Sequence, residues 1–96
     1  MLLHENVKIT RNAGAISAPL EEGLALLDIE RGAYFDFNAV ARSIWEALDS
    51  PITPTELRDQ LLATYDVPPE QCFIEVMEFL NYLQSKGLLH IVGQSR

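Results

Sequence analysis

The spacing of hydrophobic residues changes along this chain, from short strand-like segments in the first part to a helical period in the second. Residues 24–29 and 33–37 favour strands, and Gly32 between them supplies the positive φ that a bulged hairpin loop over 30–32 requires. In the second segment one face carries Ala33, Phe35 and Phe37, and the other carries Tyr34 and Asp36. The pattern predicts an antiparallel hairpin with one face on a core and one solvated face.

The segments that flank this hairpin and the end of the chain carry weaker signals. Residues 1–14 alternate only weakly, and we interpret them as an arm. Residues 15–20 favour a short edge strand, because Pro19 is tolerated only at an edge or a bulge. Residues 88–92 predict either a last strand or an extended tail.

Two helices are expected in the middle of the chain. Asn38 is a good N-cap for a first helix that runs to about residue 49. A second helix has a strong start, because Thr53 can cap it, Pro54 suits its first turn and Glu56 can complete a capping box. This second helix should end near residue 66, since the residue before a proline avoids the helical region.

A third helix is expected over residues 69–86, with Gly87 as the residue that ends it. Its apolar side chains span an arc of roughly 160°, which is wider than a surface helix of a small domain needs to bury. They are Cys72, Phe73, Val76, Met77, Phe79, Leu80 and Leu83. The order of elements predicts one α+β domain over residues 1–96, resembling a winged helix-turn-helix, in which a small antiparallel sheet of about three strands precedes three helices.

Composition and charge narrow the classes of function. Apolar residues make up 48% of the chain and charged residues 22%, which is typical of a globular protein. Seven basic residues against fourteen acidic ones give a net charge of −7, which disfavours binding to nucleic acid or anionic lipid. No apolar run approaches the roughly 20 residues of a membrane span, and the start of the chain lacks signal-peptide features. We therefore expect a cytoplasmic protein without a membrane partner.

Candidate catalytic chemistry is sparse. Cys72 is the single cysteine, and the two histidines lie near opposite ends of the chain. Glu75 and Glu78 are one helical turn apart, but neither a histidine nor a third carboxylate accompanies them. No phosphate-binding glycine loop or nucleophile motif is present. We expect no enzyme activity, metal or cofactor, and a protein that acts by binding.

A binding site is expected where the strand 33–37 lies beside the third helix. If this strand is at an edge, its free backbone groups are a template for an added peptide strand, and helix side chains supply the pockets. The candidate residues are Ala33, Tyr34, Phe35, Asp36, Phe37, Phe73, Val76, Met77 and Leu80. The alternative is that the apolar members of this set are core residues.

The order of several short motifs resembles the PqqD-like family. The segment Leu26-Leu27-Asp28, Gly32, Tyr34 and Phe37-Asn38 follows the family pattern LLD-x-x-x-G-x-Y-x-x-L-N, with Phe37 where leucine is common, and an Ile44-Trp45 helix comes next. Further similarity lies at Thr53-x-x-Glu56-Leu57, Tyr65-Asp66-Val67 and Leu83-x-x-x-Gly87-Leu88-Leu89. The resemblance covers roughly residues 7–89.

The resemblance implies a recognition element for ribosomally made, post-translationally modified peptides. The version of the motifs present here looks most like the stand-alone leader-binding protein of lasso-peptide clusters. It implies that a precursor leader docks as an extra strand, and that a separate cysteine protease and a cyclase then act. A related alternative is the peptide chaperone of pyrroloquinoline quinone synthesis.

Three alternatives come from other classes. A winged-helix DNA-binding regulator has the same element order, but the third helix presents Glu70, Glu75 and Glu78 where such proteins present basic residues. A structural subunit that stabilises an enzyme is a second alternative. A homodimer formed through edge strands or domain swapping is a third.

Overall fold

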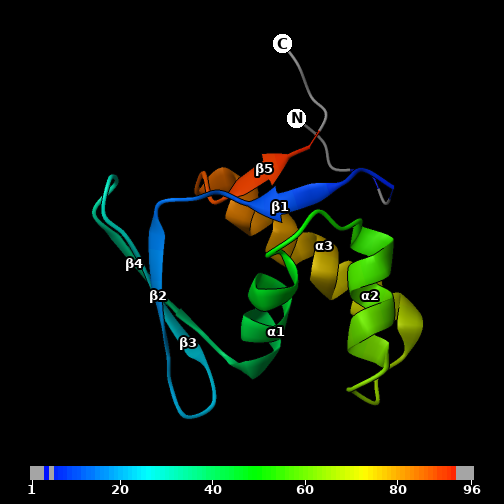
Figure 1. The fold of residues 1–96 in the computed structure, drawn as a ribbon. Coiled ribbons are helices and arrows are strands. Elements are labelled where there is room, and N and C mark those ends of the chain that lie inside the picture. Colours follow the sequence, from blue (N-terminus) through cyan, green and yellow to red (C-terminus); the bar gives the residue numbers. More distant parts are fainter. Residues whose placement is uncertain (1–3, 5, 93–96) are drawn as a thin grey trace.

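The computed structural model of the chain describes residues 4 and 6–92, and shows a sheet on one side and helices on the other (Figure 1). Part of the arm expected over residues 1–14, namely residues 1–3 and 5, lies outside the described residues. The elements in order are β1 (Ile9–Arg11), β2 (Ala15–Pro19), β3 (Leu24–Asp28), β4 (Ala33–Phe37), α1 (Ala39–Ala47), α2 (Pro54–Leu62), α3 (Pro69–Ser85) and β5 (Leu89–Ile91). The predicted α+β order, a small antiparallel sheet followed by three helices, is confirmed.

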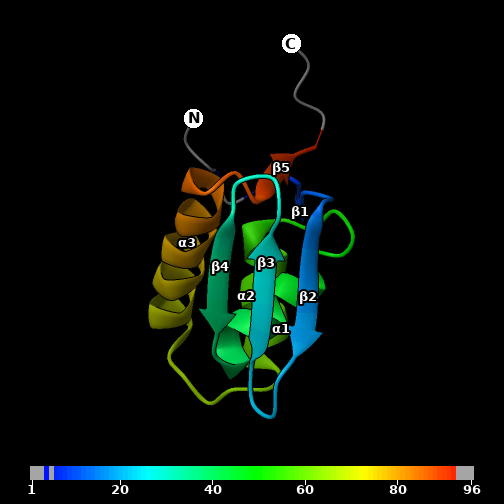
Figure 2. The ribbon, with the colours of Figure 1, turned by 90° about the vertical axis from the view of Figure 1, so that its left-hand side faces the viewer.

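The main sheet has the order β2-β3-β4, and both of its pairings are antiparallel. Its inner face carries Leu24, Leu26, Phe35 and Phe37, all of them buried. Helix α1 lies behind this inner face, α2 lies on the far side of α1 from the sheet, and α3 runs alongside β4 (Figure 1 and Figure 2). The expected edge position of β2 is confirmed, and β4 is the opposite edge of the sheet.

The loop between β3 and β4 is held by a buried carboxylate. Asp28 ends β3, and its side chain accepts hydrogen bonds from the Arg31 backbone N–H at 3.3 Å and from the Arg31 guanidinium at 3.1 Å. Gly32 has a φ of 66°, as expected for a loop residue. Because β3 ends at Asp28 rather than at residue 29, the loop has one residue more than the sequence predicted.

Helix ends follow the capping signals of the sequence. The Asn38 side chain accepts from the Ala41 backbone N–H at 2.8 Å, and Thr53 and Glu56 form a complete capping box. Gly87 has a φ of 74°, and the backbone N–H of Leu88 bonds to the Leu83 carbonyl at 2.9 Å, which closes α3 in a Schellman motif. Helix α2 ends at residue 62, four residues before the expected position, because the chain tightens into i→i+3 turns there.

Strand β1 pairs with β5 in a second, two-stranded antiparallel sheet. Ile9 is fully buried, and its backbone exchanges two hydrogen bonds of 2.9 Å with Ile52. The Leu48 carbonyl at the end of α1 accepts hydrogen bonds from the Arg11 backbone N–H at 3.0 Å and the Thr10 hydroxyl at 2.6 Å. Residues 9–12 of the segment expected to be an arm are therefore packed against the fold, whereas Ala13 and Gly14 are exposed.

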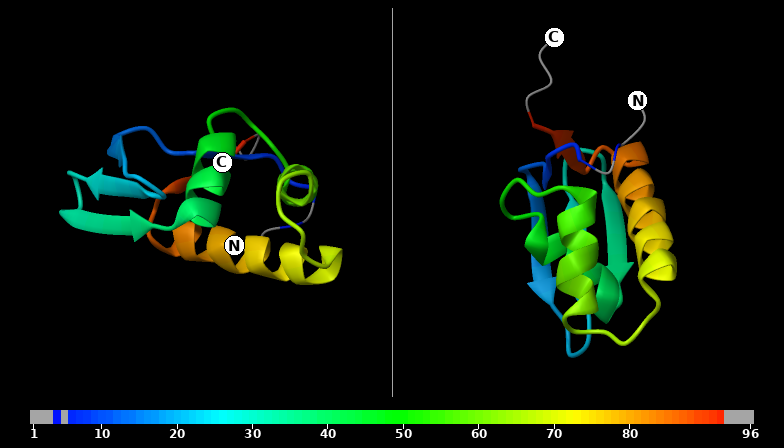
Figure 3. Two further views of the ribbon diagram at one scale, coloured as in Figure 1. Left: turned by 90° about the horizontal axis from the view of Figure 1, so that it is seen from below. Right: turned by 90° about the vertical axis from the view of Figure 1, so that its right-hand side faces the viewer.

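One cluster of buried side chains joins the elements. It includes Leu26 from the sheet, Leu48 at the C-cap of α1, Leu57 from α2, and Leu80 and Leu83 from α3. Figure 3 shows α3 extending past both other helices and reaching the edge of β4. Helix α3 thus contributes one side to the core and leaves a flank beside the open edge of the sheet.

Candidate functional site

An open groove lies between the free edge of β4 and helix α3. It encloses about 380 Å³. Its lining residues are Tyr34, Phe35, Asp36, Phe37, Asn38, Ala41, Phe79 and Tyr82. Because β4 pairs with β3 on one side only, alternate backbone N–H and C=O groups of β4 point toward this groove.

The floor of the groove is aromatic. The rings of Phe37 and Phe79 meet edge to face at 5.2 Å between centroids, and those of Phe35 and Tyr82 do so at 6.2 Å. Phe79 and Tyr82 are stacked at 6.3 Å. These side-chain contacts hold α3 against β4. They leave the outward backbone N–H and C=O groups of β4 available for hydrogen bonds to an added strand.

The rims of the groove are exposed and partly charged. Tyr34 on β4 is 65% exposed and Tyr82 on α3 is 43% exposed. Asp36 is the one charged residue among those that line the groove. The Lys86 ammonium lies over the Tyr82 ring at 5.6 Å, near the C-terminal end of α3. The groove therefore offers apolar surface, an unpaired strand edge and a negative charge.

The structure brings only some of the predicted site residues to this groove. Tyr34, Phe35, Asp36 and Phe37 line it, and Ala33 lies at the loop end of β4 opposite Asp28. Val76 and Leu80 are buried in the core, at 1% and 0% exposure. Phe73 packs against the Arg58 guanidinium at 5.7 Å, and Met77 lies one turn further along the same flank. None of the four α3 residues predicted from the sequence is among the lining residues.

The α3 residues that do line the groove are Phe79 and Tyr82. They are three positions apart and therefore share the flank of α3 that faces β4. Phe79 belonged to the predicted apolar arc, but a helical period alone does not say which flank of an arc meets the sheet. Tyr82 continues that flank with an amphipathic ring, the type of residue that is enriched in binding surfaces.

The first side chain considered for chemistry is the thiol of Cys72. Cys72 is buried, and this burial, together with the nearby Glu75 carboxylate, raises the pKa of its thiol. Within residues 4 and 6–92, no three His, Cys, Asp or Glu side chains are placed to hold a metal ion. No described helix is long and apolar enough to cross a membrane.

Comparison with known proteins connects this chain to one family. The model of the family described as coenzyme PQQ synthesis protein D (PqqD) matches residues 23–89, which include both β4 and α3. The comparison with curated proteins gave no match.

Three solved structures share the fold over most of their length. The chain is similar to TbiB1 in complex with the TbiA(beta) leader peptide, with 28% identity, a TM-score of 0.76, and coverage of 91% of this chain and 99% of that one. It is similar to lasso peptide synthetase B1 complexed with the leader peptide, at 21% identity and a TM-score of 0.74, covering 85% of this chain and 96% of that one.

The third structure is the PqqD truncation of Methylobacterium extorquens PqqCD, described as a functional, stand-alone recognition element for ribosomally synthesized and post-translationally modified peptides. The identity is 21% and the TM-score 0.74, with coverage of 92% of this chain and 94% of that one. At 21% identity, the second and third structures establish the fold.

Proposed function

Because this chain belongs to the PqqD family, we propose that it binds the leader segment of a ribosomally made precursor peptide and presents it to separate maturation enzymes. The observation that carries the proposal is the free edge of β4 beside the aromatic flank of α3. The complexes of TbiB1 and of lasso peptide synthetase B1 with leader peptides support it.

The binding mode that suits this groove is strand addition. A leader that pairs with β4 satisfies the outward backbone groups of the strand, which gives affinity with little dependence on sequence. Alternate leader side chains then point to opposite faces of the new strand, and half of them meet Phe79 and Tyr82. Main-chain hydrogen bonds thus supply affinity, and the helix flank supplies selectivity.

The two edges of the sheet are unequal as templates. Strand β2 contains Pro19, which has no backbone N–H to donate to an added strand. Strand β4 has no proline, and α3 lies alongside it with two aromatic rings in the groove. We therefore assign the leader to β4.

The site residues in this proposal divide by position. Tyr34 and Asp36 contact the leader from the strand, and Phe79 and Tyr82 contact it from the helix. Val76 and Leu80 hold α3 in place from the core. A role for Phe73 and Met77 stays a prediction from the sequence, and it requires a leader that also reaches the opposite flank of α3.

Presentation of the precursor to an enzyme works by raising a local concentration. Holding the leader keeps the attached core peptide near any enzyme that associates with the complex, which raises the effective concentration of the core peptide without chemistry in this chain. We propose lasso-peptide maturation as the setting, with a cysteine protease that removes the leader and a cyclase that closes the ring. The alternative within the family is delivery of a precursor to the enzymes of pyrroloquinoline quinone synthesis.

The test is a fluorescence-anisotropy titration with the labelled leader of the precursor encoded beside the gene for this chain. We expect saturable, submicromolar binding that weakens about tenfold in Tyr82→Ala, since one aromatic contact with its buried area contributes on the order of 1–2 kcal/mol. The matched control is Ile74→Ala, which truncates a 57% exposed side chain of the same helix outside the groove.

Two outcomes would contradict parts of the proposal. Absence of binding by the folded wild-type chain would remove leader recognition and favour a structural subunit of an enzyme. Weaker binding in Met77→Ala, with unchanged binding in Tyr82→Ala, would move the site to the opposite flank of α3.

A further inference from the structure

Asp36 is the one charged residue on the outer face of the strands β2, β3 and β4, because Asp28 is buried at the end of β3. Asp36 is exposed and lies opposite Ala25 of β3, which in turn lies opposite Ala18 of β2. These two alanines have no polar side-chain group and are too short to cover the carboxylate. The negative charge of Asp36 is therefore open at the edge of an otherwise uncharged face.

The basic side chains near the two ends of β4 have other partners. At the loop end, the Arg31 guanidinium pairs with the Asp28 carboxylate at 3.1 Å. At the opposite end, the Arg42 guanidinium pairs with Glu46 at 2.9 Å and donates to a backbone carbonyl of the β2–β3 turn at 3.1 Å. Within residues 4 and 6–92, the Asp36 carboxylate has no hydrogen-bond or ion-pair partner. In the chain without a peptide, water solvates this charge.

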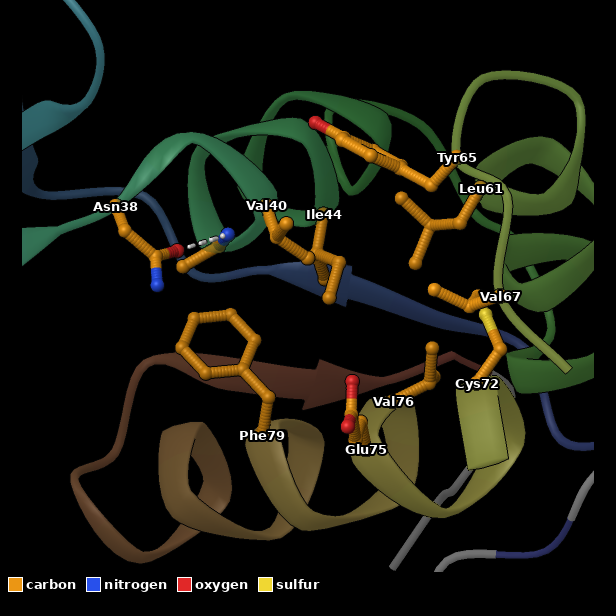
Figure 4. A pocket seen from close by; sticks show the side chains of 11 residues that line it. Asn38, Val40, Ile44, Leu61, Tyr65, Val67, Cys72, Glu75, Val76 and Phe79 are labelled. Carbon is orange, nitrogen blue, oxygen red and sulfur yellow. Dashed lines mark hydrogen bonds between the residues drawn. The ribbon is translucent and has the colours of Figure 1, made fainter. Parts of the chain in front are cut away.

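The sign of the charge changes along the groove. Near the loop end of β4, the Lys86 ammonium lies over the Tyr82 ring. The opposite end holds Asp36, and the groove continues there into an apolar cavity in which Glu75 is the one charged lining residue (Figure 4). The two ends of the groove therefore differ in charge, and a cation on a bound peptide is favoured at the Asp36 end in particular.

A leader strand added to β4 changes the surroundings of Asp36 from an edge to an interior position of the sheet. The Cβ atom of the leader residue directly opposite then lies about 4.5–5.5 Å from the Cβ atom of Asp36. This neighbour displaces part of the water around the carboxylate, and the lost hydrogen bonds need a replacement. An ammonium or guanidinium group supplies them, whereas a second carboxylate adds repulsion between like charges.

We propose that Asp36 is a specificity-determining residue, which selects leaders with lysine or arginine at the position opposite to it and rejects leaders with aspartate or glutamate there. The inference rests on the proposed leader binding. It adds a charge determinant to that binding, because backbone pairing with β4 does not depend on the charge of the leader side chains. Specificity then comes from repulsion of the wrong leader as well as from attraction of the right one.

The test is a charge scan of the labelled leader, in which each residue in turn is replaced by lysine and by glutamate, with binding read by fluorescence anisotropy. At one position we expect the lysine leader to bind about fivefold more tightly than the glutamate leader. Asp36→Asn should remove most of this preference, and Asp36→Lys should reverse it. The matched controls are Glu70→Gln and Glu70→Lys, which change the net charge equally at an exposed position outside the groove and should keep the preference.

A measurement on the wild-type chain keeps the test independent of the folding of the variants. The preference for lysine over glutamate should shrink as salt is added, because ions screen a charge pair at the surface. The inference is overturned if the leader binds but no position prefers lysine, or if the preference does not respond to salt. It is also overturned if the Glu70 variants lower the preference as much as the Asp36 variants, since net charge is then the cause. Failure of the leader to bind at all is a different result, which contradicts the proposed function.

Discussion

Arg31 connects the β3–β4 loop to the end of α3, and this contact explains two residues of the sequence motif. Its guanidinium pairs with the buried Asp28 carboxylate, and an added Cβ on Gly87 would lie 2.6 Å from an Arg31 nitrogen. The positive φ of Gly87 favours glycine at this position, and the Arg31 guanidinium packs against the face of Gly87 where a side chain would begin. A charged side chain near the last carbonyls of α3 also complements the negative end of the helix.

The capping box of α2 gives a pH dependence that can be measured. The backbone N–H of Thr53 donates to the Glu56 carboxylate at 3.0 Å, and this hydrogen bond lowers the pKa of Glu56 below its ordinary value of 4.5. A lowered folded-state pKa means that ionised Glu56 stabilises the fold above pH 4.5, and that this contribution is lost as the pH falls through the folded-state value.

The variant that tests this effect is Glu56→Gln, which keeps an acceptor for the Thr53 backbone N–H but removes the charge. Urea unfolding should show wild type more stable than Glu56→Gln at neutral pH, with a difference that shrinks as the solution becomes acidic. Glu78→Gln is the control, because Glu78 is exposed and caps no helix. A difference between wild type and Glu56→Gln that is independent of pH would contradict this account.

At the scale of elements, the turn between β2 and β3 packs closely against the end of β4 at Gly23. Gly23 is buried, and an added Cβ there would overlap the Phe37 carbonyl. Gly32 has a positive φ but open space around it. A substitution of Gly23 therefore tests the cost of steric crowding, and a substitution of Gly32 tests the cost of backbone strain.

We expect Gly23→Ala to lower the free energy of unfolding by about 3 kcal/mol, because overpacking against the backbone forces β4 to shift. Gly32→Ala should cost about 1 kcal/mol, from the left-handed backbone alone. Chemical denaturation of both variants checks the order. Equal losses would mean that the β2–β3 turn moves away from Phe37 without cost.

The elements themselves follow from local signals, whereas the flank of α3 that meets β4 does not. Asn38 and Thr53 predict the starts of α1 and α2, and Gly87 predicts the end of α3. The alternation of Phe35 and Phe37 with polar residues predicts a strand with one buried face. Phe73 and Phe79 both lie in the apolar arc of α3, and the arc has the same width whichever flank faces the sheet. The rotation of α3 is set by tertiary packing, through Phe37 on Phe79 and Phe35 on Tyr82.

Strands β1 and β5 show the same limit over a longer distance. The segment 9–11 has weak alternation of its own, and its partner 89–91 lies at the other end of the chain. Their pairing depends on the finished core, since Ile9 is buried among residues contributed by the helices. A local pattern does not contain that information, so the sequence predicted an arm where the structure has a strand.

For the molecule as a whole, the net negative charge favours peptide recognition over DNA binding. The chain carries a net charge of −7, and the exposed acidic residues of α3 include Glu70, Glu75 and Glu78. On α2, the Arg58 guanidinium is paired with Asp59 at 3.0 Å. A helix with this acidic surface is repelled electrostatically by the phosphate backbone of DNA.

We therefore expect no electrophoretic shift of duplex DNA by the chain, at low or at physiological salt. A basic winged-helix protein run in parallel provides the control for the gel. A shift that weakens as salt is added would indicate phosphate contacts and would contradict an account based on peptide recognition alone.

The most direct test of the central claim is isotope-filtered NMR of the labelled chain with its unlabelled leader peptide. The account predicts cross-strand contacts between the leader backbone and the backbone of residues 33–37, together with contacts to the Phe79 and Tyr82 rings. Backbone contacts to residues 15–19, or leader contacts confined to Phe73 and Met77 with the β4 edge unchanged, would contradict it.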